Sequence, residues 1–229
     1  MRINKYISET GYCSRRQTDR LIAAKRITIN GVTCEAGADV EPSDIVLIDG
    51  APIPSKAEPV YLALNKPIGI TCTASKEVEG NIIDFVNYPT RIFAIGRLDK
   101  ASEGLILLTN DGDIVNKMMR SENGHEKEYI VTVDKPITQS FIDEMSRGVH
   151  ILGVTTKPCD VFRINDYEFR IILTQGLNLQ IRRMCKALGY RVERLERVRI
   201  MNITIEGLDR GKWRELADDE LIALFALLQ

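Results

Sequence analysis

The amino-acid sequence predicts an α+β protein in which a small helix-hairpin module precedes a larger domain with a mixed, largely antiparallel sheet. From Val60 onward, strand-like runs outnumber helical ones and follow each other without regular crossovers, which disfavours a doubly wound parallel sheet. A loose, proline-rich stretch from Pro52 to Pro59 separates the two parts. We therefore expect a module at residues 1–58 and a domain at residues 59–229.

The small module combines one helix with two strand-turn units. Ser14 and Gln17 have the spacing of a capping box, so a helix is predicted to begin after Ser14. Leu21, Ile22 and Ala24 are expected to face inward from that helix. Each strand-turn unit contains an Asn-Gly or Asp-Gly pair, which favours a tight hairpin turn. The two units are expected at residues 26–32 and 45–53.

The larger domain is expected to contain strands and helices whose ends are marked by capping residues. Asp113, Thr138 and Asp218 are each predicted to be the N-cap of a helix. Gly189 is predicted to close a further helix at residues 178–188, because glycine tolerates the left-handed conformation that often ends a helix. Strands are expected at residues 60–67, 91–99, 105–109, 126–134 and 167–176.

Charge is distributed unevenly along the chain, although the formal net charge is only -1. Residues 1–31 hold seven basic side chains against two acidic ones, residues 32–58 hold one against six, and residues 178–199 again hold seven against two. Two basic segments in a nearly neutral chain indicate contact with phosphates at two places, and solvated helix faces are the alternative. The arginines at the start of the predicted first helix oppose its dipole, a placement that favours phosphate contact over stability.

Several classes of protein are disfavoured. The five cysteines are odd in number and scattered, without a C-x-x-C pair, so neither a disulfide framework nor a zinc site is expected. Two histidines leave little for histidine-based catalysis, and the signatures of nucleotide hydrolases, dehydrogenases and zinc hydrolases are missing. Asp111 and Asp113 lack EF-hand spacing and are expected to form a turn and a cap, so no metal is expected. The sequence lacks a signal-peptide block and any apolar run near the ~18 residues of a membrane span, so a cytoplasmic protein is expected.

Three residues are candidates for chemistry. Asp99 follows a strand and precedes a turn of small residues, so flanking glycines could present its carboxylate at the rim of the sheet; a turn-capping aspartate is the alternative. Arg182 lies at the edge of the buried stripe of the 178–188 helix, from where it could reach Asp99 and keep that carboxylate ionised. Tyr129, on an alternating strand, is either a core aromatic or a platform for a base drawn out of its helix.

A family resemblance runs essentially from Arg2 to the C-terminus. Five segments of the larger domain carry it: LNKPIGI (64–70), GRLDKASEGLILLTNDGD (96–113), EKEYIVTVDKPIT (126–138), QGLNLQIRRMC (175–185) and GKWRELADDEL (211–221). Together they resemble the RsuA-type pseudouridine synthases, most closely those that act on 23S ribosomal RNA. The opening INKYISETGYCSRR (3–16) is similar to the start of the alpha-L RNA-binding module of a ribosomal protein.

The resemblance implies an isomerase that converts one uridine of 23S ribosomal RNA to pseudouridine without a cofactor or a metal. Asp99 matches the family's essential catalytic aspartate, which acts on a flipped-out base. Tyr129 matches the tyrosine that stacks on the base, and Arg182 matches the basic partner of the aspartate. A carboxylate, a cation and an aromatic ring can perform this chemistry without histidine or thiol.

The resemblance also implies contacts with the substrate and with the surrounding RNA. The side chains expected to contact the uridine are Arg97, Lys66 and Ile181, and those expected to bind RNA are Arg2, Lys5, Arg15, Arg16, Arg20 and Lys25. Leu179 departs from the family pattern, because relatives carry a polar or basic residue there; we expect it to affect target choice rather than the reaction. The protein is expected to act as a monomer on a stem-loop.

Three other interpretations remain open from the sequence. The same chemistry could act on small-subunit ribosomal RNA or on transfer RNA. The chain could be a non-catalytic RNA-binding factor in ribosome assembly. It could also be a metal-dependent nuclease built on Asp99, Asp111 and Asp113.

Overall fold

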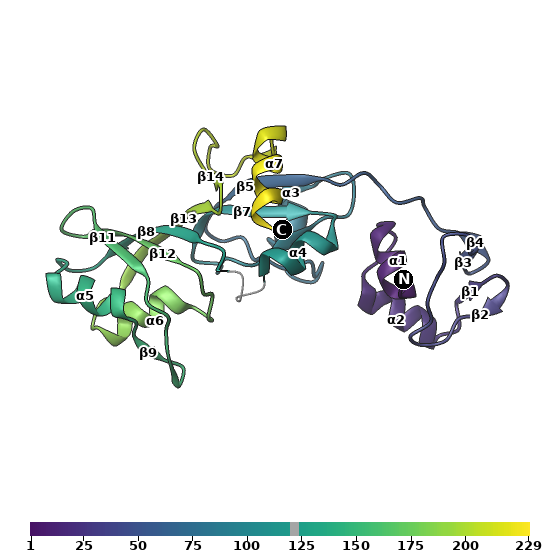
Figure 1. Ribbon diagram of the computed structural model, residues 1–229, viewed down its shortest axis with the longest axis horizontal. Helices are drawn as coiled ribbons and strands as arrows, with labels where there is room; N and C mark the ends of the chain where they lie inside the picture. The colour runs from purple at the N-terminus through teal and green to yellow at the C-terminus, as the bar shows by residue number, and fades with distance from the viewer. Residues whose placement is uncertain (120–123) are drawn as a thin grey trace. The chain divides into compact units, whose positions relative to one another are not determined.

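The computed structural model describes residues 1–119 and 124–229. Within it the chain forms two compact units (Figure 1). Unit 1 comprises Met1–Val60 with two short later segments, Tyr88–Ile92 and Asn110–Gly112. Unit 2 comprises the remaining described residues and contains the larger sheet.

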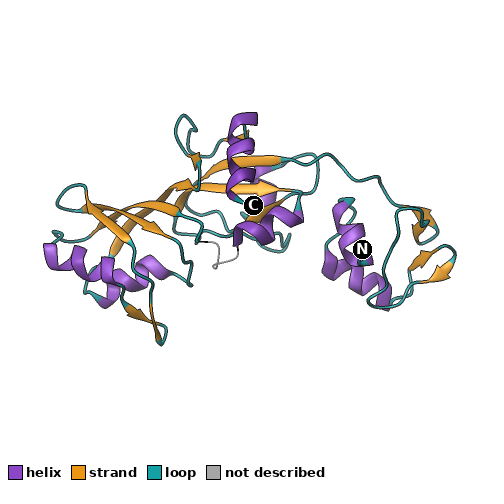
Figure 2. Ribbon diagram, in the orientation of Figure 1, coloured by secondary structure: helices purple, strands orange, loops and turns teal. Residues whose placement is uncertain are grey.

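Unit 1 pairs two helices with a small antiparallel sheet. Its strands lie in the order β2-β1-β3-β4 (Figure 2). The elements are α1 (Ile3–Glu9), α2 (Arg15–Ala23), β1 (Ile27–Ile29), β2 (Val32–Thr33), β3 (Val46–Ile48) and β4 (Ala51–Pro52). Both predicted hairpin turns are confirmed, since Asn30-Gly31 and Asp49-Gly50 have positive φ at both positions.

The predicted capping box begins α2. Ser14 Oγ accepts a hydrogen bond from the Gln17 backbone N–H at 3.2 Å, and Gln17 Oε1 accepts one from the Ser14 N–H at 2.9 Å. Ile22 is buried as predicted, but Ala24 is exposed, because the helix ends at Ala23 and Ala24 is its C-cap. Helix α1 was not predicted, because seven residues are too short to show a repeating apolar pattern.

Unit 2 is built on a nine-stranded sheet, which confirms the expected mixed, largely antiparallel architecture. The main path runs β11-β12-β8-β13-β7-β5-β15, with β6 paired to β7 and β14 paired to β13. Among the described strands only β7 and β13 pair in parallel. The strands are β5 (Tyr61–Lys66), β6 (Phe93–Ile95), β7 (Glu103–Thr109), β8 (Lys127–Val133), β11 (Asp160–Arg163), β12 (Glu168–Leu173), β13 (Val192–Ile200), β14 (Ile203–Thr204) and β15 (Trp213–Glu215). A separate hairpin joins β9 (His150–Ile151) and β10 (Val154–Thr155).

Five more helices follow the first two along the described chain: α3 (Ile82–Val86), α4 (Gly112–Met119), α5 (Gln139–Arg147), α6 (Gln180–Ala187) and α7 (Asp218–Leu227). Thr138 caps α5 as predicted, and Gly189 follows the C-cap of α6 with φ +79°. Asp113 and Asp218 are not caps, because α4 and α7 begin at Gly112 and Asp218 and both carboxylates lie in the first turn. In the described residues no helix has both the length and the apolar character that crossing a membrane requires.

Strand β13 was not predicted, because its sequence is rich in charged residues and resembles a basic surface segment. In the structure these charges are largely paired across the sheet. Arg194 Nε lies 2.6 Å from Glu103 Oε1, and Arg199 Nε lies 2.7 Å from Glu128 Oε2. Arg197, in the same strand, is buried. The basic segment at residues 178–199 is therefore not a continuous phosphate-binding surface.

The parallel contact between β7 and β13 requires a glycine. Gly104 pairs with Arg197 and has φ +103°, a conformation that side chains rarely adopt. A Cβ atom at position 104 would lie 2.3 Å from the Arg197 carbonyl oxygen and 2.6 Å from its amide nitrogen. Backbone atoms at the centre of a sheet cannot yield to such an overlap without breaking the pairing.

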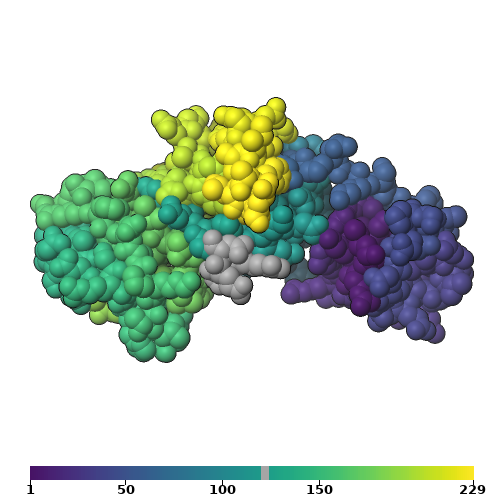
Figure 3. Space-filling view, in the orientation of Figure 1, coloured from purple at the N-terminus to yellow at the C-terminus, as the bar shows by residue number. Residues whose placement is uncertain are grey.

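Helix α7 packs through Leu224 and Leu228 and lies at the surface of unit 2, in yellow in Figure 3. Glu220 holds its start in place: its carboxylate accepts hydrogen bonds from Arg214 at 2.6 and 2.7 Å and from the Ala217 N–H at 2.9 Å. The hydrogen bond with Arg214 is the main reason that the pKa of Glu220 lies below its usual range.

The close approach at Gly104 predicts that Gly104→Ala destabilises unit 2 by more than about 3 kcal/mol, because the new methyl group overlaps the backbone of Arg197. Gly176→Ala is the matched control, since a Cβ there meets no atom within 4 Å, and we expect a change within about 0.5 kcal/mol. Urea unfolding followed by circular dichroism measures both. Equal stability of the two variants would contradict the argument.

The lowered pKa of Glu220 predicts a pH-dependent stability difference. A lowered carboxyl pKa contributes stability above the ordinary value, and this contribution is lost as the pH falls through the folded-state value. Glu220→Gln should therefore cost about 1 kcal/mol at pH 7, after allowance for solvent screening, and less as the pH falls below the ordinary carboxyl pKa towards pH 3. Urea midpoints at both pH values, with exposed Glu206→Gln as control, test this; a loss independent of pH would count against it.

Candidate active site

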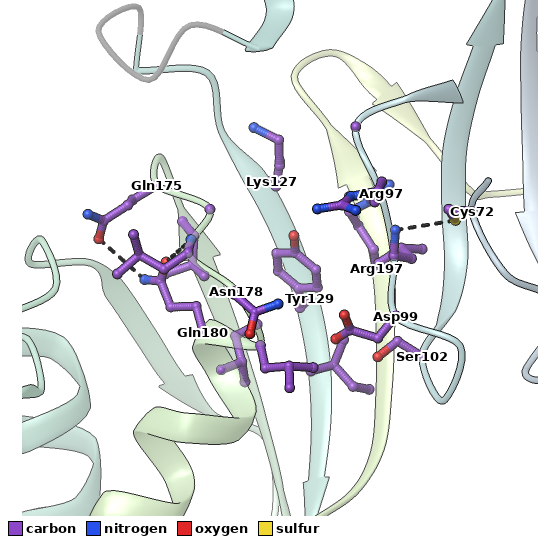
Figure 4. Close-up of a pocket in the computed structure, with 18 of the residues that line it drawn as sticks. Cys72, Arg97, Asp99, Ser102, Lys127, Tyr129, Gln175, Asn178, Gln180 and Arg197 are labelled. Carbon is purple, nitrogen blue, oxygen red and sulfur yellow. Dashed lines mark hydrogen bonds between the residues drawn. The ribbon is translucent and has the colours of Figure 1, made fainter. Parts of the chain in front are cut away.

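The candidate site is a cavity of about 480 Å³ in unit 2. Its floor includes side chains of β8 and β13, and its walls include the loop between β6 and β7, the segment 173–182 and the end of α4 (Figure 4). Asp99, Tyr129, Arg182, Arg97 and Ile181, all singled out from the sequence, line this one cavity. Residues far apart in the chain therefore meet here.

Asp99 lies in the tight loop between β6 and β7. The loop begins at Gly96, which has a φ of +75°. The sharp turn expected from the glycines that flank Asp99 is therefore present at this position. Backbone hydrogen bonds hold it at two points: the Ser102 N–H donates to the Asp99 carbonyl at 3.0 Å, and the Gly69 N–H donates to the Lys100 carbonyl at 2.8 Å. The Asp99 side chain is half-buried and lines the cavity, so the loop presents a carboxylate to a ligand.

Arg182 holds the turn that follows Asp99. Its Nη2 donates to the Ala101 carbonyl at 3.0 Å and to Ser102 Oγ at 3.3 Å, and its Nη1 donates to the Val192 carbonyl at 3.3 Å. In the described chain no cation lies within 4 Å of the Asp99 carboxylate as an ion pair. The expected direct pair of Arg182 with Asp99 is therefore absent from this structure, and the guanidinium binds the adjacent backbone instead.

Tyr129 contacts both the core and the cavity. On β8 it pairs with Ile171 of β12 on one side and Arg197 of β13 on the other. Its half-buried ring packs against the core beneath α5 and α6 and also lines the cavity. Figure 4 shows the ring rising from the floor, with Asp99 on one side and Asn178 on the other.

Lys66 was expected to contact substrate, but it does not line the cavity. Its side chain is fully buried, and Nζ donates to the carbonyls of Pro67 at 2.9 Å and Ile70 at 3.0 Å. Burial lowers the pKa of Lys66, and Cys72, Asp99 and Glu103 nearby oppose that shift. Lys66 is therefore a buried support of the loop that follows β5.

The expected RNA-binding side chains of unit 1 fall into two groups. Arg2 pairs with Asp39, and Lys5 lies 3.5 Å from Glu9, so neither is free of a protein carboxylate. The other four are exposed, and the described part of the chain provides no ion pair for them: Arg15, Arg16, Arg20 and Lys25. Only this second group presents unpaired positive charge.

Sequence reasoning missed part of the cavity. Lys127 could have been found, because it lies two residues before Tyr129 in a predicted strand and so shares its face. Arg197 could not, because β13 itself was not predicted. Asn178 is held by Arg183, which donates to its backbone carbonyl at 3.0 Å and its Oδ1 at 3.2 Å. Leu179 begins α6 in a left-handed conformation, with φ +51°, at the cavity wall.

The cavity is strongly cationic. Its described lining contains one carboxylate, that of Asp99, and five cations: Arg97, Lys100, Lys127, Arg182 and Arg197. Such a surplus of positive charge attracts a polyanionic ligand. In the described ranges no three His, Cys, Asp or Glu side chains gather as metal ligands would, and all five cysteines are free thiols.

Comparisons with known proteins identify the family of this chain. Residues 60–187 match the RNA pseudouridylate synthase family, and residues 1–46 match the S4 domain. The chain is 55% identical to dual-specificity RNA pseudouridine synthase RluF of Escherichia coli (strain K12), over 100% of this chain and 80% of that protein. It is 33% identical to ribosomal large subunit pseudouridine synthase B of Bacillus subtilis (strain 168), over 99% and 96% of the two chains.

One solved structure supports the same assignment. A crystal structure of a pseudouridylate synthase superposes with a TM-score of 0.72 at 28% identity and covers 98% of this chain and 99% of that one. The predicted family is thus confirmed by sequence and by fold. The chain belongs to the RNA pseudouridine synthase family and carries an S4 domain at its N-terminus.

Proposed function

We propose that this protein converts a uridine of 23S ribosomal RNA to pseudouridine, with Asp99 as the nucleophile. The observation that carries the proposal is the single carboxylate of a cationic cavity, presented by a tight loop next to the ring of Tyr129. The relatives named above act on RNA, and one of them acts on the large ribosomal subunit. Asp99 is the residue in this cavity best suited to attack a nucleoside.

The reaction is an isomerisation, so it balances without an added reagent. The bond from uracil N1 to ribose C1′ breaks, and its electron pair stays with the base. The base turns, a bond forms from C5 to C1′, and the proton lost from C5 is balanced by the proton gained at N1. The carboxylate of Asp99 forms a bond to C1′ as N1 leaves, and that bond breaks when C5 attacks C1′, so Asp99 ends as the free carboxylate.

The neighbouring residues have distinct roles in this proposal. The ring of Tyr129 stacks on the flipped base, and Ile181 packs beside it. Arg182 is a positioning residue, since its guanidinium holds the Ala101–Ser102 turn that follows the nucleophile. Arg97, exposed at the cavity wall, contacts the RNA around the target.

We propose that each of the two units contacts the RNA through its own residues. Residues 1–58 form the RNA-binding module and residues 59–229 the catalytic domain. Arg15, Arg16, Arg20 and Lys25 of α2 and its C-terminal end contact phosphates of a stem-loop. Flipping a base costs a few kcal/mol, and least for an unpaired one, so loops are the expected targets. We propose that the protein acts as a monomer in the cytoplasm, where it meets ribosomal RNA.

The proposal predicts loss of one pseudouridine from ribosomal RNA in a strain that lacks this protein. Carbodiimide treatment and primer extension across all ribosomal RNA should show one missing stop, restored by the wild-type gene. Asp99→Asn should fail to restore it, because an amide is a poor nucleophile. Asp209→Asn, at an exposed position outside the cavity, is the control that should restore it fully.

Other outcomes of that experiment separate the alternatives. A missing stop in small-subunit RNA, or only in transfer RNA, would move the target and keep the chemistry. Restoration by Asp99→Asn would remove the nucleophile from the proposal and favour an RNA-binding assembly factor. Strand cleavage in place of a modified base would favour a nuclease.

A second prediction concerns α2. The double variant Arg15→Gln, Arg16→Gln should bind the target stem-loop more weakly, and the slope of log affinity against log salt should fall by roughly two, because two phosphate contacts are lost. The turnover rate at saturating RNA should stay close to wild type. Full affinity with an unchanged salt slope would show that these arginines do not dock the RNA.

A further inference from the structure

The cavity contains two cations that the proposed chemistry does not use. Arg197 and Lys127 lie on the adjacent strands β13 and β8 and line the cavity floor with Tyr129. Figure 4 shows Lys127 above the hydroxyl end of the Tyr129 ring and Arg97 and Arg197 to the right of it, with Asp99 lower on the same side as the two arginines. The cavity therefore has positive charge near the tyrosine hydroxyl and the carboxylate lower along the same wall.

Arg197 is a buried cation with an unused donor. Its side chain is 3% exposed, and Nε donates to the Leu105 carbonyl at 2.6 Å. Its Nη2 is buried and has no hydrogen-bond partner among the described residues. A buried guanidinium donor left unpaired costs free energy, so such a group is usually satisfied by a ligand or by solvent.

Lys127 adds a second charge close by. Its Nζ donates to the His125 carbonyl at 3.3 Å, a neutral partner. Burial lowers the pKa of Lys127, and repulsion from Arg197 lowers it further, so the two cations are close enough to disfavour each other. The carboxylates beside Lys127 in the chain, Glu126 and Glu128, are paired with Arg199 instead.

The position of the pair is set by the sheet. Arg197 pairs with Tyr129 on β8 and with Gly104 on β7, and β13 has an irregularity between Arg197 and Arg199. Bulges of this kind redirect side chains and are frequent next to active sites. Because the backbone at Gly104 permits no shift, the guanidinium stays at the cavity floor beside the tyrosine.

Among the described residues neither Arg197 nor Lys127 forms an ion pair with a carboxylate, and two neighbouring positive charges are stabilised by an anion. We propose that Arg197 and Lys127 form a phosphate-binding site that holds a backbone phosphate next to the target uridine. This inference rests on the proposed function and adds a specific contact to it. Uracil is neutral and cannot offset two cations, whereas a phosphodiester supplies one full charge and several acceptor oxygens. Binding of the phosphate places the nucleotide so that its base lies on Tyr129.

A thermodynamic coupling experiment tests this contact. The probes are a stem-loop RNA modified by the wild-type protein and copies with a neutral methylphosphonate at each phosphate flanking the target. For wild type, one replacement should weaken binding roughly tenfold, in line with loss of a charge-assisted contact. Lys127→Met should weaken binding of natural RNA by a similar factor. Replacing the same phosphate by methylphosphonate should not weaken binding to this variant further, because the contact is already lost.

Three variants make the result specific. Arg191→Met removes an exposed arginine outside the cavity, and its sensitivity to methylphosphonate should equal that of wild type. Arg197→Lys, which keeps the charge, should retain more affinity than Arg197→Gln. Where Arg197→Gln does not fold, as judged by circular dichroism, Lys127→Met still decides the question. Lys127→Met should raise KM far more than it lowers kcat, which loss of folded protein would not do.

The opposite result is equally clear. Methylphosphonate at each flanking position could weaken RNA binding to Lys127→Met by the same factor as it weakens binding to wild type. In that case these side chains do not contact a backbone phosphate. Failure of the proposed function is separate, because wild type would then form no pseudouridine in any RNA. In that case uridine 5′-monophosphate and uridine are compared by NMR titration: a preference for the phosphate that Lys127→Met abolishes supports the site, and equal binding overturns it.

Discussion

The parallel pairing of β7 and β13 at Gly104 and Arg197 is the constraint on which the rest of unit 2 depends. The two backbones approach so closely that only glycine can occupy position 104. With β7 held there, the loop that carries Asp99 enters the sheet directly beside β13. Since β8 pairs with the other edge of β13, Tyr129 lies across from Arg197. One strand thus brings the carboxylate loop and the aromatic ring to the same cavity.

Buried charge supports this arrangement. Glu103, at the start of β7, is 2% exposed and is bound by Arg194 at 2.6 Å and by Arg210 at 3.0 Å. Lys66 lies in the next strand with its ammonium on two carbonyls. Such groups are costly to bury, and they are tolerated because each has partners: two arginines for Glu103, and two carbonyls of the loop after β5 for Lys66.

The net charge is nearly neutral, but paired and unpaired charges are distributed unevenly over the protein. In unit 1, acidic residues neutralise Arg2, Lys5 and Arg26, whereas the arginines of α2 remain exposed. In unit 2, the arginines of β13 at positions 194 and 199 are paired across the sheet, whereas Lys127 and Arg197 at the cavity have no ion pair among the described residues.

The sequence by itself determined the α+β organisation, the capped helices α2 and α5, and the cavity residues Asp99, Tyr129 and Arg182, because caps, turns and compact motifs are local signals. Tertiary structure decided the rest. Strand β13 has charges that become part of a sheet only when Glu103 and Glu128 lie beside them. Lys66 is charged, yet it is buried because its partners come from the loop that follows it. The partners of Arg182 lie about 80 residues earlier or ten later in the chain, so only folding could show that it binds carbonyls rather than Asp99.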